Sequence, residues 1–127
     1  MLKIGEDTAW MSDYYDYIRD GGAKEAYALL IGTLVCMKSV TCYRKRQGEV
    51  RSVGIDVDGE CWFALMPTQD WLTFQWRPPV TRSKRYRAAH LRSQFPDSFT
   101  LPQDEHWAVR IKTIEDALLL LLILDLP

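Results

Sequence analysis

Residues 60–77 read ECWFALMPTQDWLTFQWR, and this stretch decides the fold. In its second half apolar side chains alternate with polar ones, so one side of the segment is apolar and the other is polar. Such a period of two is typical of a strand with one buried face. The stretch therefore predicts two antiparallel strands, at 60–66 and 71–77, joined by a turn at Pro67–Asp70.

The same period of two continues on both sides of this stretch. Upstream, residues 39–46 and 49–57 predict two further strands separated by Gln47-Gly48. Asp58-Gly59 then provides the strongest turn signal, because both residue types tolerate the positive φ angles of a two-residue hairpin. Downstream, the alternation in residues 107–112 predicts a fifth strand. The sequence thus predicts an antiparallel sheet of four or five strands.

Two helices are predicted before the first strand. Ser12 is expected to cap a short helix at 13–19, which the pair Gly21-Gly22 ends. A second, almost entirely apolar helix is expected to begin at Ala23 and to give way to strand near Ser39. A helix of this kind needs cover on several sides. The predicted fold is therefore α+β, with the helices packed on one face of the sheet.

The last segment, residues 113–127, reads TIEDALLLLLILDLP. Thr113 is expected to begin a helix, with Asp116 three residues later as a weaker form of the capping box. Leu or Ile occupies every position from 118 to 124, so no rotation of this helix turns a polar stripe to solvent. One face can cover the sheet, and the other can be covered by the first long helix of the same chain or by a second copy. We expect a homodimer that forms through this helix.

The composition indicates a single globular α+β domain at 1–127. The 127 residues include 16 Lys and Arg against 17 Asp and Glu, and 47% are apolar, which excludes a disordered or low-complexity protein. The three cysteines lack CxxC spacing, which argues against a disulfide framework and favours the cytoplasm. The longest apolar run, 117–124, is shorter than the about 20 residues of a membrane span, so no membrane partner is expected.

Positive charge is concentrated in two parts of the chain. Residues 77–92 hold six basic residues and no acidic one, and residues 38–54 hold five basic residues and one acidic one. We expect a helix at 82–94, followed by a loop at 96–103. The candidate anion-binding residues are Arg44, Lys45, Arg46, Arg82, Lys84, Arg85, Arg87 and Arg92.

These cations form one surface if the two segments meet in the fold. Such a surface, with Trp71, Trp76 or Tyr86 beside it to stack on bases, is typical of proteins that bind RNA or single strands. We therefore expect a non-enzymatic binding module whose partner is anionic, such as nucleic acid or an acidic protein. The alternative is a solvated basic helix whose charge is balanced by acidic neighbours in space.

The aromatic residues support a second function, the binding of a flat or cationic small molecule in a pocket between the sheet and the helices. The candidate pocket residues are Trp62, Trp71, Trp76 and Tyr86. Their alternative role is packing in the core. A separate aromatic group consists of Trp10, Tyr14, Tyr15 and Tyr17. Because successive helical residues point about 100° apart, at least one of this group should line a surface or an interface.

No catalytic motif is present in the sequence. Neither His90 nor His106 has a second histidine or a paired acid at ligand spacing. Cys61 lies between apolar neighbours, which favours an inert, buried thiol. The acidic residues within 56–60 surround one hairpin turn and are poor support for a cation site. We therefore predict no catalytic residue, no metal and no cofactor. A hydrolase built around the two histidines is the third function considered.

Part of the chain resembles a known family. A strand pair such as GECWFALMPTQDWLTFQWRPP (59–79), followed by an insertion and by WAVRIKTIEDALLLLLIL (107–124), resembles a small α+β domain of unknown function. That domain is known as a predicted transport-like domain and is often appended to restriction-type nucleases. The likeness covers about 55–124, and the insertion at 80–104 is longer and more basic than the family pattern. It implies an accessory, nucleic-acid-associated or protein-interaction module, with no catalytic residues to carry over.

Overall fold

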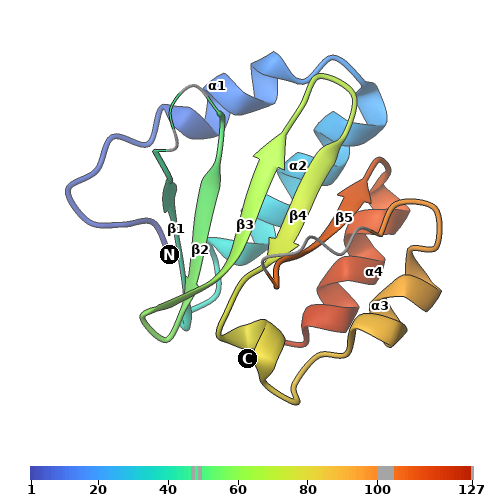
Figure 1. Cartoon of the computed structure of the whole chain (residues 1–127). Helices are drawn as coiled ribbons and strands as arrows, with labels where there is room; N and C mark the ends of the chain where they lie inside the picture. Colours follow the sequence, from blue (N-terminus) through green and yellow to red (C-terminus); the bar gives the residue numbers. More distant parts are fainter. Residues whose placement is uncertain (47, 49, 100–104, 127) are drawn as a thin grey trace.

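The structure is a computed structural model that describes residues 1–46, 48, 50–99 and 105–126. In this part of the chain five strands form one sheet, and each pairs antiparallel with its neighbours in chain order (Figure 1). The strands are β1 (Val40–Arg44), β2 (Val53–Val57), β3 (Glu60–Pro67), β4 (Leu72–Trp76) and β5 (Trp107–Ile111). This meander confirms the predicted antiparallel sheet.

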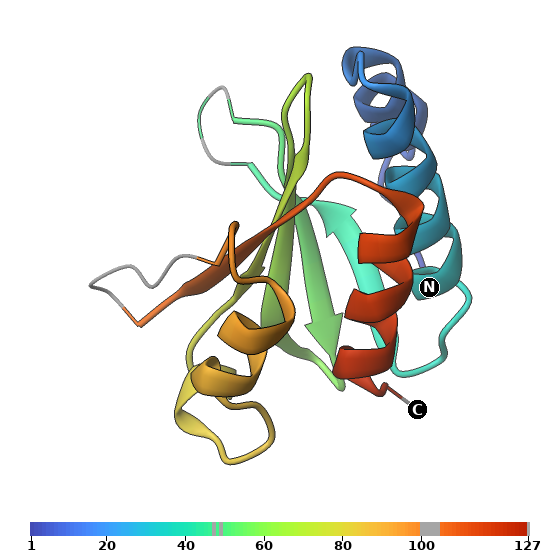
Figure 2. The same cartoon turned by 90° about the vertical axis from the view of Figure 1, so that its right-hand side faces the viewer.

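The helices lie on one face of the sheet, which confirms the α+β fold. They are α1 (Trp10–Tyr17), α2 (Gly21–Leu34), α3 (Ala88–Gln94) and α4 (Ile114–Leu124), and a 3₁₀ turn, η1 (Val80–Arg82), precedes α3. Figure 2 shows α1, α2 and α4 on the same side of the sheet, with α2 and α4 side by side. The first long helix of the chain therefore covers one side of the last helix.

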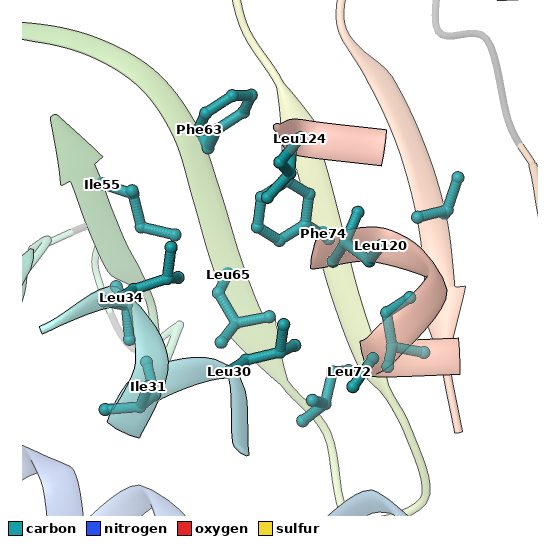
Figure 3. Close-up of a cluster of buried hydrophobic side chains, with 14 of the residues drawn as sticks. Leu30, Ile31, Leu34, Ile55, Phe63, Leu65, Leu72, Phe74, Leu120 and Leu124 are labelled. Carbon is teal, nitrogen blue, oxygen red and sulfur yellow. The ribbon is translucent and has the colours of Figure 1, made fainter. Parts of the chain in front are cut away.

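The core fills the layer between the sheet and these helices. Figure 3 shows apolar side chains from β2, β3 and β4 facing those from α2 and α4. Its labelled residues are Leu30, Ile31, Leu34, Ile55, Phe63, Leu65, Leu72, Phe74, Leu120 and Leu124, and each is at most 5% exposed. The alternation read from the sequence thus places the apolar face of the strands against the helices.

Two local signals act as predicted. Asp58 and Gly59 have φ angles of 51° and 84° and make the turn between β2 and β3. Thr113 Oγ1 accepts a hydrogen bond from the Asp116 N–H at 3.1 Å, while Asp116 Oδ2 accepts one from the Lys112 N–H at 3.0 Å. This capping box fixes the start of α4.

The glycine pair was expected to end a helix, and this prediction is wrong. Gly21 and Gly22 begin α2, because Asp20 caps it: Asp20 Oδ2 accepts a hydrogen bond from the Ala23 N–H at 2.9 Å. A Cβ atom at Gly22 would lie 2.8 Å from the Lys112 carbonyl oxygen, so glycine at this position lets α2 approach the turn between β5 and α4. Likewise, α1 begins at Trp10, and Ser12 lies inside it rather than at its cap.

The helix predicted at 82–94 is also shorter than expected. Residues 83–87 are not helical and α3 begins only at Ala88. The cause is tertiary, since the buried Tyr86 donates a hydrogen bond to the Leu124 carbonyl oxygen at 2.7 Å and draws the segment toward the end of α4. Of the loop predicted at 96–103, residues 100–103 lie outside the described part of the chain, as do Gln47 and Glu49 of the first hairpin.

The two edges of the sheet are each met by another part of the chain. At β1, Leu2 forms an isolated parallel bridge with Cys42, whose N–H donates to the Met1 carbonyl oxygen at 2.8 Å. At β5, the Ser98 hydroxyl donates to the Arg110 carbonyl oxygen at 3.4 Å. Within the described residues, no helix has the length and apolar character needed to span a membrane.

Candidate anion-binding site

A small cavity of about 200 Å³ lies beside the segment that precedes α3. It is lined by Lys84, Arg85, Tyr86, Arg87, His90, Leu91 and Ile123. Three of these side chains are basic, one is an imidazole, and none is a carboxylate. The cavity therefore combines positive charge with a partly apolar wall.

Two anchors hold this segment in place. Tyr86 packs its ring against those of Phe63 and Trp76, with centroids 6.0 and 6.3 Å apart. Burial raises the pKa of Tyr86, which keeps its hydroxyl protonated as a donor to the Leu124 carbonyl. Arg85 Nη2 donates to the Asp125 carbonyl oxygen at 2.9 Å, and its positive charge suits the carboxyl end of α4. Arg85 is thus engaged within the fold.

Lys84, Arg87 and His90 are the free groups of the cavity. All three are exposed, and their side chains make no hydrogen bond or ion pair with any residue that the structure describes. The sequence pattern identified Lys84 and Arg87 as candidates but assigned no ligand to His90. His90 is the third residue of α3 and lines the same cavity. This position could not be predicted from the sequence without knowing that α3 begins at Ala88. These three side chains are the ones available to an anionic partner.

The other basic residues of this region are partly engaged. Arg82 Nε donates to Glu105 Oε2 in an exposed ion pair. The Arg92 guanidinium carbon lies 5.2 Å from the centroid of the Phe99 ring. Neither residue lines the cavity beside Lys84. The predicted anion-binding set therefore separates into free cations and cations with partners inside the chain.

The two basic segments approach each other only through Lys45 and Arg77 among the described residues, which are close enough for their charges to interact. Arg44 ends β1, and Figures 1 and 2 both place the loop that follows it at the opposite end of the sheet from η1 and α3. Lys45 is half-buried, and burial lowers its pKa, whereas Arg46 is exposed. Arg44 lines a second cavity, together with Arg51, which was not among the candidates predicted from the sequence. Arg44 and Lys84 therefore line two separate cavities.

Two of the four candidate pocket aromatics, Trp76 and Tyr86, are in ring contact, with centroids 6.3 Å apart. Trp76 is fully buried in the core, whereas Tyr86, at 7% exposed, packs against the core and also lines the cavity beside Lys84. Trp62 lies beside Arg85, with 5.4 Å from the guanidinium carbon to the ring centroid. Trp71 precedes β4, at the other end of the strand from Trp76, and its ring lies under Arg110 at 4.5 Å. The three tryptophans therefore lie in different surroundings.

The remaining candidates for chemistry are dispersed. Among the described residues, no three His, Cys, Asp or Glu side chains are grouped so as to hold a metal ion. Asp56 accepts a hydrogen bond from the Tyr43 hydroxyl at 2.9 Å. Cys61 is half-buried, with its sulfur 3.8 Å from the Phe63 carbonyl oxygen. These contacts are those of a folded sheet surface.

Comparison of the chain with family models, with curated proteins and with solved structures found no match. The resemblance of residues 55–124 to a nuclease-associated domain therefore stays a prediction. The function must be inferred from the surface and the charges of this chain itself.

Proposed function

We propose that the chain is a non-enzymatic module that binds nucleic acid through Lys84, Arg87 and His90. The observation that supports this most directly is their arrangement: three exposed nitrogen-bearing side chains without partners in the described chain surround one cavity, and none of its described lining residues is a carboxylate. Phosphate groups satisfy such donors, and phosphate contacts supply most of the affinity of nucleic-acid-binding proteins.

The apolar part of the cavity favours nucleic acid over an acidic protein. Ile123 is half-buried beside the cations and offers an apolar contact to the sugar or base next to a bound phosphate. The resemblance of residues 55–124 implies a nucleic-acid-associated or protein-interaction module, which is compatible with this partner.

A binding titration tests this proposal. The affinity for a short fluorescent single strand is expected to fall steeply between about 50 and about 200 mM salt, because phosphate contacts release counterions. The double variant Lys84→Ala/Arg87→Ala should bind more weakly and should reduce the salt slope by about 0.7 for each phosphate that it no longer neutralises. Lys38→Ala removes the same kind of charge from an exposed position outside the cavity and should change neither quantity.

The result can also contradict the proposal. Binding that is independent of salt, or that is equal in the wild type and the double variant, would show that the cavity is not the phosphate site. Binding of an acidic peptide in place of every oligonucleotide would assign the surface to a protein partner instead.

We also propose that the chain forms a homodimer through the outer face of α4. Ile114, Leu118 and Leu122 follow one another at four-residue spacing and are 37%, 50% and 78% exposed. On the neighbouring helix α2, Ala28 and Gly32 are exposed and small. Large apolar side chains on α4 thus lie beside small residues on α2. The two surfaces can fit those of a second copy related by a two-fold axis, and none of these five residues is charged.

Sedimentation at micromolar concentration tests the dimer. The wild type should sediment with about twice the 14.8 kDa mass of the chain. The double variant Leu118→Gln/Leu122→Gln should sediment as a single chain, whereas Glu115→Gln, on the same helix, should leave the dimer intact. A wild type that sediments only at 14.8 kDa would rule out the dimer.

A cytoplasmic location belongs to the same proposal. Cys36, Cys42 and Cys61 are free thiols, and Cys36 is exposed. Burial raises the pKa of Cys42 to about 11, so this thiol stays protonated at neutral pH. Exposed free thiols persist best in a reducing compartment.

A further inference from the structure

A cavity of about 300 Å³ opens between α1 and the end of the β1–β2 hairpin. Its lining residues are Trp10, Asp13, Tyr14 and Tyr17 from α1, and Arg44, Gly48, Val50 and Arg51 from the hairpin. Figure 1 shows α1, which supplies half of this lining, near the opposite end of the sheet from η1 and the segment that leads to α3, which supplies most of the lining of the Lys84 cavity. The two cavities are therefore separate and are formed by different elements.

The strand alternation explains why arginines line this cavity. Arg44 follows the buried Val40 and Cys42 at a spacing of two, and Arg51 precedes the buried Val53 at the same spacing. Alternation places both arginines on the face of the sheet that packs against the helices. At this end of the sheet, beneath α1, two arginines thus occupy positions on the face that carries apolar core residues elsewhere.

The walls of the cavity are held by aromatic contacts. The Arg51 guanidinium carbon lies 3.6 Å from the centroid of the Tyr17 ring, a stacked arrangement that leaves the N–H groups at the guanidinium edge free to donate. Trp10 and Tyr14 pack with their ring centroids 5.9 Å apart, and the Tyr14 hydroxyl donates to the Ser52 carbonyl oxygen at 3.5 Å. Helix α1 is thereby tied to the hairpin, and the cavity is formed before any ligand arrives.

Among the lining residues that the structure describes, the charges do not cancel. Arg44 and Arg51 face a single carboxylate among the described lining residues, that of Asp13, and neither arginine forms an ion pair with a residue that the structure describes. A guanidinium presents two parallel donors that match the oxygens of a carboxylate or a phosphate. The surplus positive charge beside flat rings selects a ligand that has both an anionic group and an aromatic part.

We infer that this cavity binds a small organic anion in which a flat ring carries a carboxylate or a phosphate group. The anionic group contacts Arg44 and Arg51, and the ring lies against the exposed Val50, next to the edge of the buried Trp10. The volume is at the lower end of the range of about 300–1,000 Å³ for small-molecule sites, so the ligand is no larger than a mononucleotide. This site is independent of the nucleic-acid surface proposed above.

Calorimetric titration with two probes, adenosine monophosphate and benzoate, tests the inference, with NMR shifts of the Trp10 indole N–H to locate binding. At least one probe should bind and should shift that signal. Arg51→Gln is exposed and should fold normally, yet it should weaken binding at least about tenfold, because a charge-assisted hydrogen bond is removed. Arg46→Gln removes the same charge from a neighbouring residue that does not line the cavity and should bind as the wild type does.

Further arms of the experiment separate the sources of binding. Inorganic phosphate and adenosine each lack one half of the proposed ligand and should bind more weakly than the probes. Equal affinity for inorganic phosphate, equal affinity in Arg51→Gln, or no binding of either probe would each overturn the inference. The Lys84→Ala/Arg87→Ala variant should bind the probes as the wild type does, so this test and that of the nucleic-acid surface fail independently.

Discussion

Replacing Leu120 by alanine is expected to lower the free energy of unfolding by about 2–5 kcal/mol. Leu120 is fully buried in the middle of α4, where it faces the sheet (Figure 3). Removal of its side chain deletes apolar packing and leaves a cavity that the neighbouring side chains cannot fill completely. Urea denaturation followed by circular dichroism measures the change, at a protein concentration low enough to exclude association.

Leu122→Ala is the matched control for this prediction. It makes the same chemical change in the same helix, but Leu122 is 78% exposed. Its effect on the free energy of unfolding should lie within about 0.5 kcal/mol. Equal destabilisation by the two substitutions would contradict the orientation of α4, and with it the division into a buried face and an outer face.

Replacing Gly22 by alanine is expected to lower the free energy of unfolding by about 1–3 kcal/mol. The new Cβ atom would lie 2.8 Å from the Lys112 carbonyl oxygen and 3.2 Å from Asp20 Oδ2. The first of these is a backbone atom at the start of α4, so relief requires α2 and the β5–α4 turn to move apart. The second belongs to the cap of α2, so the same movement weakens that cap.

Gly21→Ala provides the comparison. No atom lies within 4 Å of a Cβ atom built at Gly21, so alanine meets open space there. Because alanine is the better helix former, this variant should be as stable as the wild type or more stable, by up to about 1 kcal/mol. Thermal unfolding of the two variants side by side measures the difference. If Gly22→Ala unfolds at the same temperature as Gly21→Ala, the close approach of α2 to Lys112 is not present in solution.

The sheet was predictable because its signals are local. Alternation along each strand and the turn at Asp58-Gly59 depend only on neighbouring residues. The capping residues of α4 were predictable for the same reason. The strands, the buried face of the sheet and the start of α4 could therefore be predicted from the sequence. The order of the strands could not be predicted in this way, since β5 pairs with β4 across the connection that carries η1 and α3.

The errors occurred where distant contacts override local signals. Gly21-Gly22 looks like a helix end until Asp20 is seen to cap the helix that follows. The segment before Ala88 reads as helix, but it is not helical, and Tyr86 within it donates a hydrogen bond to a carbonyl group 38 residues away. Such contacts depend on the packing of whole elements, which one sequence does not specify.

The candidate site shows the same division. Lys84 and Arg87 followed from a run of basic residues, whereas the distance between this run and Arg44 depends on how far apart β1 and the residues after β4 lie in the sheet. Arg51 was not predicted, although the sequence holds a signal for it. It lies two residues before the buried Val53, so alternation places both side chains on the same face of the sheet. A cation on the buried face of a strand, next to a hairpin, is a sign of a cavity at the end of the core.

The contacts at the two sheet edges bear on how the protein avoids aggregation. An exposed edge strand offers unpaired N–H and C=O groups to which another chain can add as a further strand. Here the backbone of residues 1–3 occupies part of the outer side of β1, and Ser98 occupies one carbonyl of β5. Displacing the first three residues would turn β1 into an open template for fibril growth, whereas the meander itself would be unchanged.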